Sequence, residues 1–339
     1  MSRAGPLNLI TDVAGLKVGQ AEDAAVRSGV TVLLPDERAV CAVDVRGGAP
    51  GTRETDALTS DTLVDAVDAI VLSGGSVYGL AAADGVVAAL GAQQRGFRLA
   101  AASTAPVSPV IPAAILYDLA NGGAKDWGLE PPYRALGMVA LAQAAERFVL
   151  GTAGAGYGAM AGRLKGGIGS ASAVASEGFT VGALVAVNSF GSVVAPGARA
   201  FWAAPFEVDG EFGGLGAGGL KAAPDDWGLA KGGPATAREN TTIACVATDV
   251  VLTPAEARRV AIMAQDGLAR AIRPVHSPFD GDVVFALATG VHALEGPRPM
   301  AIARIGALAA DCLARAIARG VYEATPWPGT EVGCWRDLR

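Results

Sequence analysis

The stretch RENTTIACVATDV, residues 238–250, joins a glycine-rich segment to a run of small and β-branched residues. The run from Thr241 onward predicts a buried strand, because β-branched side chains pack well on a pleated surface. The segment upstream, 207–240, is glycine-rich and polar and predicts a flexible linker. Long segments without regular structure are unusual inside compact domains and are often functional or processed. The bond between Asn240 and Thr241 is therefore a candidate functional position.

On both sides of this strand, short apolar runs alternate with alanine-rich helical patterns, which predicts layered sheets and helices of an α/β protein. Strands are expected at 30–35 and 40–48, pairing with each other, and at 69–75, 283–290 and 179–194, the last as two β-runs joined by a turn at 188–191. Helices are expected at 61–68, 77–94, 133–148, 254–272 and 300–320. The best helix start has Thr253 at the N-cap, Pro254 at N1 and Glu256 at N3.

The composition is that of a compact soluble domain, since 51% of the 339 residues are apolar and 18% are charged. We expect one domain over residues 1–339. A net charge of −6 without a basic stripe argues against nucleic acid as a partner. Hydrophobic stretches such as 135–145 are too short to cross a membrane, and the N-terminus lacks the apolar region of a signal peptide. The four cysteines are scattered, which favours reduced thiols and a cytoplasmic location.

The inventory of reactive side chains excludes several kinds of site. With two histidines and no paired cysteines, neither a histidine-rich metal centre nor a zinc-ligand spacing is present, and the phosphate-binding motif GxxxxGK[ST] does not occur. The loop GAGYGAMAG (154–162) resembles a dinucleotide fingerprint only loosely and predicts a close approach of its backbone to another backbone segment or to substrate. LSGGSVYG (72–79) joins a strand to a helix, and is either an anion site made of backbone N–H groups or a tight turn that needs glycine.

Two kinds of nucleophile remain. A serine–histidine–aspartate triad would need His276 or His292, but His276 fits a loop-packing role and His292 a solvent-facing one. A threonine at the start of a chain needs no histidine, because its own α-amino group, with a pKa of roughly 7.7–8.0, takes the hydroxyl proton. Thr241 would reach that position if its hydroxyl attacked the Asn240 carbonyl and water then cleaved the ester. Asn-Thr-Thr is also an ordinary strand start, so these residues alone leave both interpretations open.

Six motifs, taken in order, resemble the self-processing aminopeptidase family. They are ITDVAGLKVGQ (10–20), VDVRGGAPGTRETD (43–56), IVLSGGSVYGLAAADGV (70–86), IPAAILYDL (111–119), NTTIACVATDV (240–250) and HSPFDGDVVFALATG (276–290). The family includes the L-aminopeptidase/D-esterase, β-aminopeptidases and the nylon-oligomer endohydrolase, and the resemblance runs from about residue 8 to 320. The NTT junction and the paired aspartates are most similar to the endohydrolase branch.

This resemblance implies that Thr241 is both the self-cleavage residue and the nucleophile of the mature enzyme. Asn240 would then end a larger fragment, 1–240, and a smaller fragment, 241–339, would begin with the nucleophile. The cut would lie at the end of the 207–240 processing linker.

The resemblance also assigns roles to other side chains by position. Asp280 and Asp282 match the acidic pair that orients the nucleophile, Asn188 an amide that donates to the oxyanion, Tyr117 a tyrosine whose hydroxyl faces the site, and Lys165 a lysine that shifts a neighbouring pKa or holds a carboxylate. Without the resemblance these would be an Asp-Gly-Asp turn, a turn asparagine, a core tyrosine and an exposed loop lysine. The residues expected to border the substrate cleft are Gly74, Gly75 and Ser76.

The fold implied is a layered α/β/β/α sandwich of the ornithine acetyltransferase type, outwardly similar to N-terminal-nucleophile hydrolases. The activity implied is hydrolysis of peptides or linear polyamide (6-aminohexanoate, nylon-type) oligomers through an acyl-enzyme. Alternatives are an aminopeptidase or esterase that releases L-, D- or β-amino acids, an acyltransferase of the ornithine type, and a non-enzymatic anion-binding protein. No metal or organic cofactor and no membrane are expected, and the expected assembly is a homotetramer of processed molecules.

Overall fold

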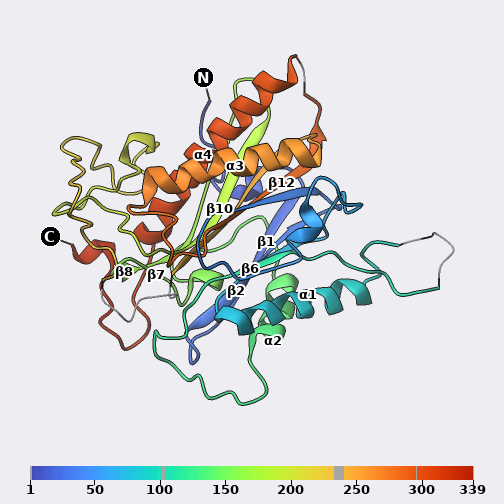
Figure 1. Cartoon of the computed structure of the whole chain (residues 1–339), viewed down its shortest axis with the longest axis horizontal. Coiled ribbons are helices and arrows are strands. Elements are labelled where there is room, and N and C mark those ends of the chain that lie inside the picture. The colour runs from blue at the N-terminus through green and yellow to red at the C-terminus, as the bar shows by residue number, and fades with distance from the viewer. Residues whose placement is uncertain (1, 99, 101–103, 233–239, 295, 339) are drawn as a thin grey trace.

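The computed structural model describes residues 2–98, 100, 104–232, 240–294 and 296–338. Their helices and strands form four layers (Figure 1). Two helices cover one five-stranded sheet, whose other face packs on a second five-stranded sheet, and two more helices cover the second sheet. The α/β/β/α sandwich expected from the sequence is thereby confirmed.

The first sheet has the strand order β3-β12-β11-β10-β9. Its strands are β3 (Val40–Val45), β12 (Val283–His292), β11 (Thr241–Val250), β10 (Thr180–Asn188) and β9 (Gly167–Val174). The central strand β11 is parallel to β12 and antiparallel to β10. Every residue of β11 is buried, because sheet neighbours flank it and a layer covers each of its faces.

The second sheet has the strand order β1-β2-β5-β6-β4. Its strands are β1 (Leu16–Asp23), β2 (Ser28–Pro35), β5 (Ile70–Ser73), β6 (Ala113–Ile115) and β4 (Thr52–Arg53), and β7 (Met160–Ala161) pairs separately with β8 (Leu164–Lys165). Apolar side chains from both five-stranded sheets form one core between them, among them Leu33, Ile70, Leu184, Ile243 and Phe285.

Helices close the sandwich on both sides. The first sheet is covered by α3 (Pro254–Ala271) and α4 (Arg298–Tyr322), and the second by α1 (Ala81–Ala92) and α2 (Tyr133–Ala142). The 3₁₀ helices are η1 (Ile10–Asp12), η2 (Asp56–Leu58), η3 (Ser76–Leu80), η4 (Gly154–Gly156), η5 (Ala204–Phe206) and η6 (Trp335–Asp337). None of the helices in the described part of the chain is long and apolar enough to cross a membrane.

Glycines allow backbone to pack directly on backbone at two places in this fold. A Cβ at Gly169 on β9 would collide with the carbonyl oxygen of Ala316 on α4, so α4 lies closer to the sheet than any side chain would permit. A Cβ at Gly156 would likewise collide with the backbone of Ile168, which confirms the close approach predicted for the loop 154–162.

The predictions that rested on strong local patterns are confirmed. Helix α3 begins with the expected capping box, in which the Thr253 hydroxyl accepts the N–H of Glu256 and the Glu256 carboxylate accepts the N–H of Thr253. The expected strands at 69–75, 241–250 and 283–290 are present as β5, β11 and β12.

Predictions about which strands pair were wrong. Residues 30–35 and 40–48 do form strands, but β2 pairs with β1 and β5 while β3 pairs with β12 in the other sheet. The 179–194 stretch contains only one strand, β10, because both of its edges are already occupied by β9 and β11.

Two helix predictions also need correction. Residues 61–68 form no helix, consistent with the low helix propensity of the threonine, valine and aspartate in that stretch. Helix α2 ends at Ala142, because the backbone of Ala145 pairs with Val18 of β1 instead of continuing the helix.

The first part of the predicted linker is packed against the fold. Arg315 of α4 donates to Glu211 at 2.5 Å, and Phe212 is buried in the outer core. The described part of the segment, 207–232, contains no helix or named strand. The role of 207–240 as a flexible processing linker stays a prediction. Residues 233–239 lie outside the described residues.

Replacing Gly169 by alanine is expected to destabilise the protein, because the Ala316 carbonyl on α4 cannot move away independently of its helix. Overpacking of this kind costs about 1–3 kcal/mol. The matched control is Gly218→Ala, where a Cβ would meet nothing within 4 Å. Thermal denaturation of the two variants checks this, and equal melting temperatures would contradict the close packing of α4.

Candidate active site

Three strand ends meet at one edge of the first sheet. Because β11 and β12 are parallel and β10 is antiparallel to β11, the starts of β11 and β12 and the end of β10 share that edge. Thr241 pairs with Asn188, and Asn240 forms a parallel bridge with Asp280. The sheet thus brings together residues that are far apart in the sequence.

Thr241 begins the buried strand and is itself 4% exposed. Its hydroxyl donates to the carbonyl oxygen of Asn240, which also accepts the N–H of Gly281 at 3.0 Å. A Cβ at Gly281 would lie 2.6 Å from the carbonyl oxygen of Ala49 and 2.7 Å from Oγ1 of Thr241. Only glycine therefore fits opposite the hydroxyl, and a hydroxyl, a carbonyl and an N–H donor lie in one place.

Asp280 and Asp282 flank that glycine and are both buried. Oδ1 of Asp282 accepts the N–H of Thr242 at 2.9 Å, and Oδ1 of Asp280 accepts the N–H of Phe190 at 3.0 Å. Burial raises the pKa of Asp280 and the Asp282 carboxylate raises it further, while hydrogen bonds from Ser277 and Phe190 oppose the rise. The two carboxylates bind the start of β11 and the segment that follows β10.

Two residues that the sequence analysis did not place in the site contact this acidic pair. Nδ1 of His276 lies 2.8 Å from Oδ2 of Asp282, and the Ser277 hydroxyl donates to Oδ2 of Asp280 at 2.6 Å. His276 and Ser277 belong to the same motif, HSPFDGD, as the two aspartates. Their closeness to Asp280 and Asp282 in the sequence was the signal that could have placed them in the site.

The predicted Asn188 and Tyr117 lie beside Thr241. Oδ1 of Asn188 accepts the N–H of Met160 at 2.9 Å, and its Nδ2 donates to the carbonyl oxygen of Tyr117 at 2.9 Å. These two bonds fix the orientation of the amide next to the strand start. Tyr117 lines the cleft that opens on Thr241.

Lys165 is buried rather than exposed, and its polar contacts are with backbone. Its Nζ donates to the carbonyl oxygens of Gly156, Ala159 and Gly166 at 3.2, 3.0 and 2.8 Å, and it lies 5.0 Å from the centre of the Trp327 ring. Burial lowers its pKa to about 7, whereas the three carbonyls favour the charged form. In the part of the chain that the structure describes, these contacts tie Lys165 to the loop before β7 and to Gly166 after β8, and not to the acidic pair.

Three backbone N–H groups of the LSGGS turn donate to acceptors within the protein. Those of Gly74 and Ser76 donate to backbone carbonyl oxygens, and that of Gly75 donates to Asp118 at 2.7 Å. Gly75 has a φ of +84°, which favours glycine. The left-handed backbone at Gly75 supports the interpretation as a tight turn that needs glycine.

A cleft of about 590 Å³ opens beside the Thr241 hydroxyl. It is lined by Gly48, Ala49, Pro50, Gly51, Ser76, Val77, Leu80, Ile115, Tyr117 and Thr241. None of these described lining residues carries a charge. Ser76 thus borders the cleft as predicted, while Gly74 and Gly75 shape the turn behind it.

A second, smaller pocket of about 110 Å³ lies on the other side of Tyr117. Its lining includes Asp118, Asn188 and Lys231, so it contains charged side chains, which the described lining of the cleft lacks. Burial raises the pKa of Asp118 to about 6.

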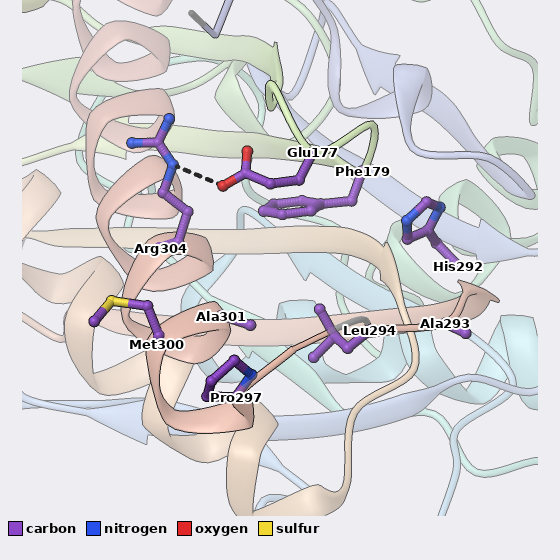
Figure 2. A pocket seen from close by; sticks show the side chains of 9 residues that line it. All are labelled: Glu177, Phe179, His292, Ala293, Leu294, Pro297, Met300, Ala301 and Arg304. Carbon is purple, nitrogen blue, oxygen red and sulfur yellow. Dashed lines mark ion pairs between the residues drawn. The ribbon is translucent and has the colours of Figure 1, made fainter.

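Another hollow of about 590 Å³ lies at the opposite end of the first sheet (Figure 2). His292, at the end of β12, borders it, and Arg304 of α4 faces Glu177 across 3.7 Å. Since Thr241 stands at the start of the parallel neighbour β11, the two hollows are separated by the length of the strands, roughly 30 Å at ~3.3 Å per residue. This hollow is not part of the site around Thr241.

Residues 8–333 match peptidase family S58. The chain belongs to this family. Membership of a peptidase family makes it a hydrolase that acts on amide bonds, and the resemblance inferred from the six motifs is confirmed.

Two curated relatives illustrate the range of the S58 family. A protein of Mycobacterium tuberculosis named as an uncharacterised aminopeptidase is 44% identical over 355 residues, covering 98% of each chain. The 6-aminohexanoate-oligomer endohydrolase of Agromyces sp. is 30% identical over 289 residues, covering 82% of this chain and 74% of its own.

A solved S58-like structure shows the same fold. The L-aminopeptidase D-Ala-esterase/amidase of Ochrobactrum anthropi, described as a variant of the Ntn-hydrolase fold, superposes with a TM-score of 0.70 and 22% identity. The match covers 98% of this chain and 91% of the other. The Ntn-hydrolase-like fold predicted for this S58 chain is confirmed.

Among the residues that the structure describes, no group of three or more His, Cys, Asp or Glu side chains could hold a metal ion.

Replacing Gly281 by alanine is expected to lower amide hydrolysis by about 10²-fold, because the added methyl group displaces the Thr241 hydroxyl or the Ala49 carbonyl. The control is Gly333→Ala, where a Cβ would meet nothing within 4 Å. Initial rates on an amide that the wild type cleaves measure the effect. A folded Gly281→Ala protein with the wild-type rate would show that this contact does not matter.

Proposed function

We propose that the chain is a self-cleaving amidohydrolase whose nucleophile is Thr241, cut into fragments 1–240 and 241–339. The observation that carries the proposal is that the Thr241 hydroxyl contacts the Asn240 carbonyl while the N–H of Gly281 donates to the same oxygen. This group stands at the start of a buried strand and opens on a cleft. Membership of a peptidase family supports the same conclusion.

Self-cleavage begins when Oγ1 of Thr241 adds to the carbonyl carbon of Asn240. The carbonyl oxygen becomes an oxyanion, which the N–H of Gly281 stabilises. The bond between the Asn240 carbonyl carbon and the Thr241 nitrogen then breaks, and the nitrogen takes up the proton that the hydroxyl has released. The acyl group remains as an ester on Oγ1. Water hydrolyses this ester, leaving a carboxylate on Asn240 and a free α-amino group on Thr241.

Substrate hydrolysis repeats this chemistry on an external amide. The α-amino group of Thr241 takes the hydroxyl proton as Oγ1 attacks the substrate carbonyl, and then gives the proton to the leaving amine. The Asn188 amide and backbone N–H groups stabilise the oxyanion. Water, activated by the same α-amino group, cleaves the acyl-enzyme and restores Thr241.

The remaining site residues support this cycle. Asp282 binds the start of β11, Asp280 binds the segment that follows β10, and the pair places negative charge near the new ammonium group of Thr241. Tyr117 borders the cleft, and we assign its hydroxyl to the substrate side. Lys165 holds the loop that carries Met160, and Met160 in turn holds Asn188, so we assign it to the oxyanion side of the site.

For the substrate we favour internal amide bonds of peptides or linear polyamide oligomers. The cleft beside Thr241 has no charged group among its described lining residues, so an uncharged, extended chain matches it better than a free amine does. The endohydrolase relative acts, by its name, on oligomers of 6-aminohexanoate.

Aminopeptidase or esterase action is the second candidate, because one observation favours it. An aminopeptidase needs a carboxylate near the scissile bond to bind the free amine, and Asp118 lies in the small pocket next to Asn188 and Tyr117. The relative from Mycobacterium tuberculosis carries the name aminopeptidase. The acyltransferase and anion-binding alternatives have no comparable support. The homotetramer and the cytoplasmic location stay predictions.

Replacing Thr241 by alanine is expected to abolish both self-cleavage and hydrolysis, because the attacking hydroxyl is lost. The matched control is Thr242→Val, since the hydroxyl of Thr242 has no hydrogen-bond partner among the described residues and adjacent strand residues face opposite sides. Intact mass of freshly purified protein, followed over days, shows whether the 33.9 kDa chain is cut.

Two fragments in the Thr242→Val protein and one intact chain in the Thr241→Ala protein are the expected result. Sequencing should place the new N-terminus at Thr241. Hydrolysis at the wild-type rate by Thr241→Ala would refute the assignment of the nucleophile.

A substrate panel separates the two candidate activities. We expect blocked amides and 6-aminohexanoate oligomers to be hydrolysed with higher kcat/KM than amino-acid p-nitroanilides with a free amine, because the cleft lining carries no charge to bind that amine. Faster cleavage of the free-amine p-nitroanilides, lost in Asp118→Asn, would establish the aminopeptidase instead.

A further inference from the structure

His276 is tied to the start of β11 through one carboxylate. Its ring Nδ1 lies 2.8 Å from Oδ2 of Asp282, and its backbone N–H donates to the same oxygen at 3.2 Å. The other oxygen of Asp282 accepts the N–H of Thr242 at 2.9 Å. Asp282 therefore connects the histidine directly to the residue that follows Thr241.

The backbone at His276 is held in an uncommon conformation. Its φ is +53°, in the left-handed region that costs an ordinary residue roughly 1–2 kcal/mol. The side chain of Asp282 is 1% exposed and that of His276 is 22% exposed, so the contact lies at the boundary of the core. A residue stays in such a conformation only where surrounding contacts hold it, and here both the ring and the N–H bind Asp282.

The next residue repeats the pattern on the other aspartate. Oδ2 of Asp280 accepts both the N–H and the hydroxyl of Ser277, at 3.0 and 2.6 Å. Consecutive residues thus hold consecutive members of the acidic pair, each with one side-chain and one backbone donor. The outer oxygens of both carboxylates are bound by this segment, which leaves their Oδ1 atoms directed at Thr242 and Phe190.

We propose that His276 is a positioning residue of this hydrolase, which donates Nδ1–H to Asp282 so that Asp282 holds the start of β11, and with it Thr241, in position for attack. The proposal rests on the function proposed above for Thr241. The contacts run from the threonine strand to Asp282 and from Asp282 to His276. In a serine–histidine–aspartate triad, by contrast, the histidine lies between the other two residues and transfers the proton. Here the Asp282 carboxylate lies between the strand and the histidine, so the imidazole orients the carboxylate and does not transfer a proton.

This role has a kinetic consequence. His276 is not among the residues that line the cleft, so its loss leaves substrate binding intact. Misplacing the nucleophile instead slows the chemical step, and partners of this outer kind typically contribute about 10–100-fold. We therefore expect the effect in kcat and in the rate of self-cleavage, with KM unchanged.

The test compares His276→Asn with His276→Gly. Both residues accept a left-handed backbone, but only asparagine offers an N–H donor at the place of Nδ1. The control is His292→Asn, which alters the chain's other histidine at the far end of the sheet. Self-cleavage by intact mass, kcat and KM on one amide substrate, and the melting temperature are measured for each.

We expect His276→Gly to lose about 10–100-fold in kcat and in self-cleavage with KM within about twofold, while His276→Asn and His292→Asn stay within about threefold of the wild type. Should His276→Gly not fold, His276→Asp replaces it, because it matches asparagine in size but presents an acceptor to Asp282. Equal losses in the asparagine variant and the variant without the donor, or no loss in either, would overturn the positioning role while Thr241→Ala remains inactive. An active Thr241→Ala protein would overturn the proposed function, and the positioning role with it.

Discussion

The parallel pairing of β11 with β12 is the constraint on which the site depends. Parallel neighbours begin at the same edge of a sheet. The residues at the start of β11 and those just before β12 therefore come together, although about 40 positions of sequence separate them. Antiparallel β10 then brings Asn188 to the same edge, directly opposite Thr241. The ladder registers, more than any loop, decide which side chains meet.

The glycine between the two aspartates sets how closely these elements approach. Gly281 donates its N–H to the Asn240 carbonyl and has no side chain to separate the turn from the Thr241 hydroxyl. The loop after β3 packs onto the same turn, since the N–H groups of Arg46 and Gly47 both donate to the carbonyl oxygen of Asp282. One wall of the cleft and the strand start are thus fastened to a single short turn, which keeps their distance constant.

Sequence reasoning succeeded where the relevant interactions are local or where a motif order is distinctive. The capping box of α3 and the β-branched run of β11 depend on neighbouring residues, and both were predicted correctly. The placement of β2 and β3 in different sheets depends on partners far along the chain, which periodicity does not specify. Lys165 and His276 show the same limit within the site. The binding of the Lys165 ammonium group by backbone carbonyls and the left-handed backbone of His276 both result from tertiary packing.

The strand order of the first sheet interleaves the segments on either side of Thr241. Strand β11 begins at Thr241 and β12 comes later in the chain, whereas β3, β9 and β10 all come before Thr241. In the sheet, β12 and β11 lie between β3 on one side and β10 and β9 on the other. A chain cut before Thr241 therefore keeps every ladder and exposes no new sheet edge. Its unfolding, however, gains a dissociation step governed by mass action, so cutting adds a dependence of the unfolding midpoint on protein concentration that a covalently continuous chain does not have.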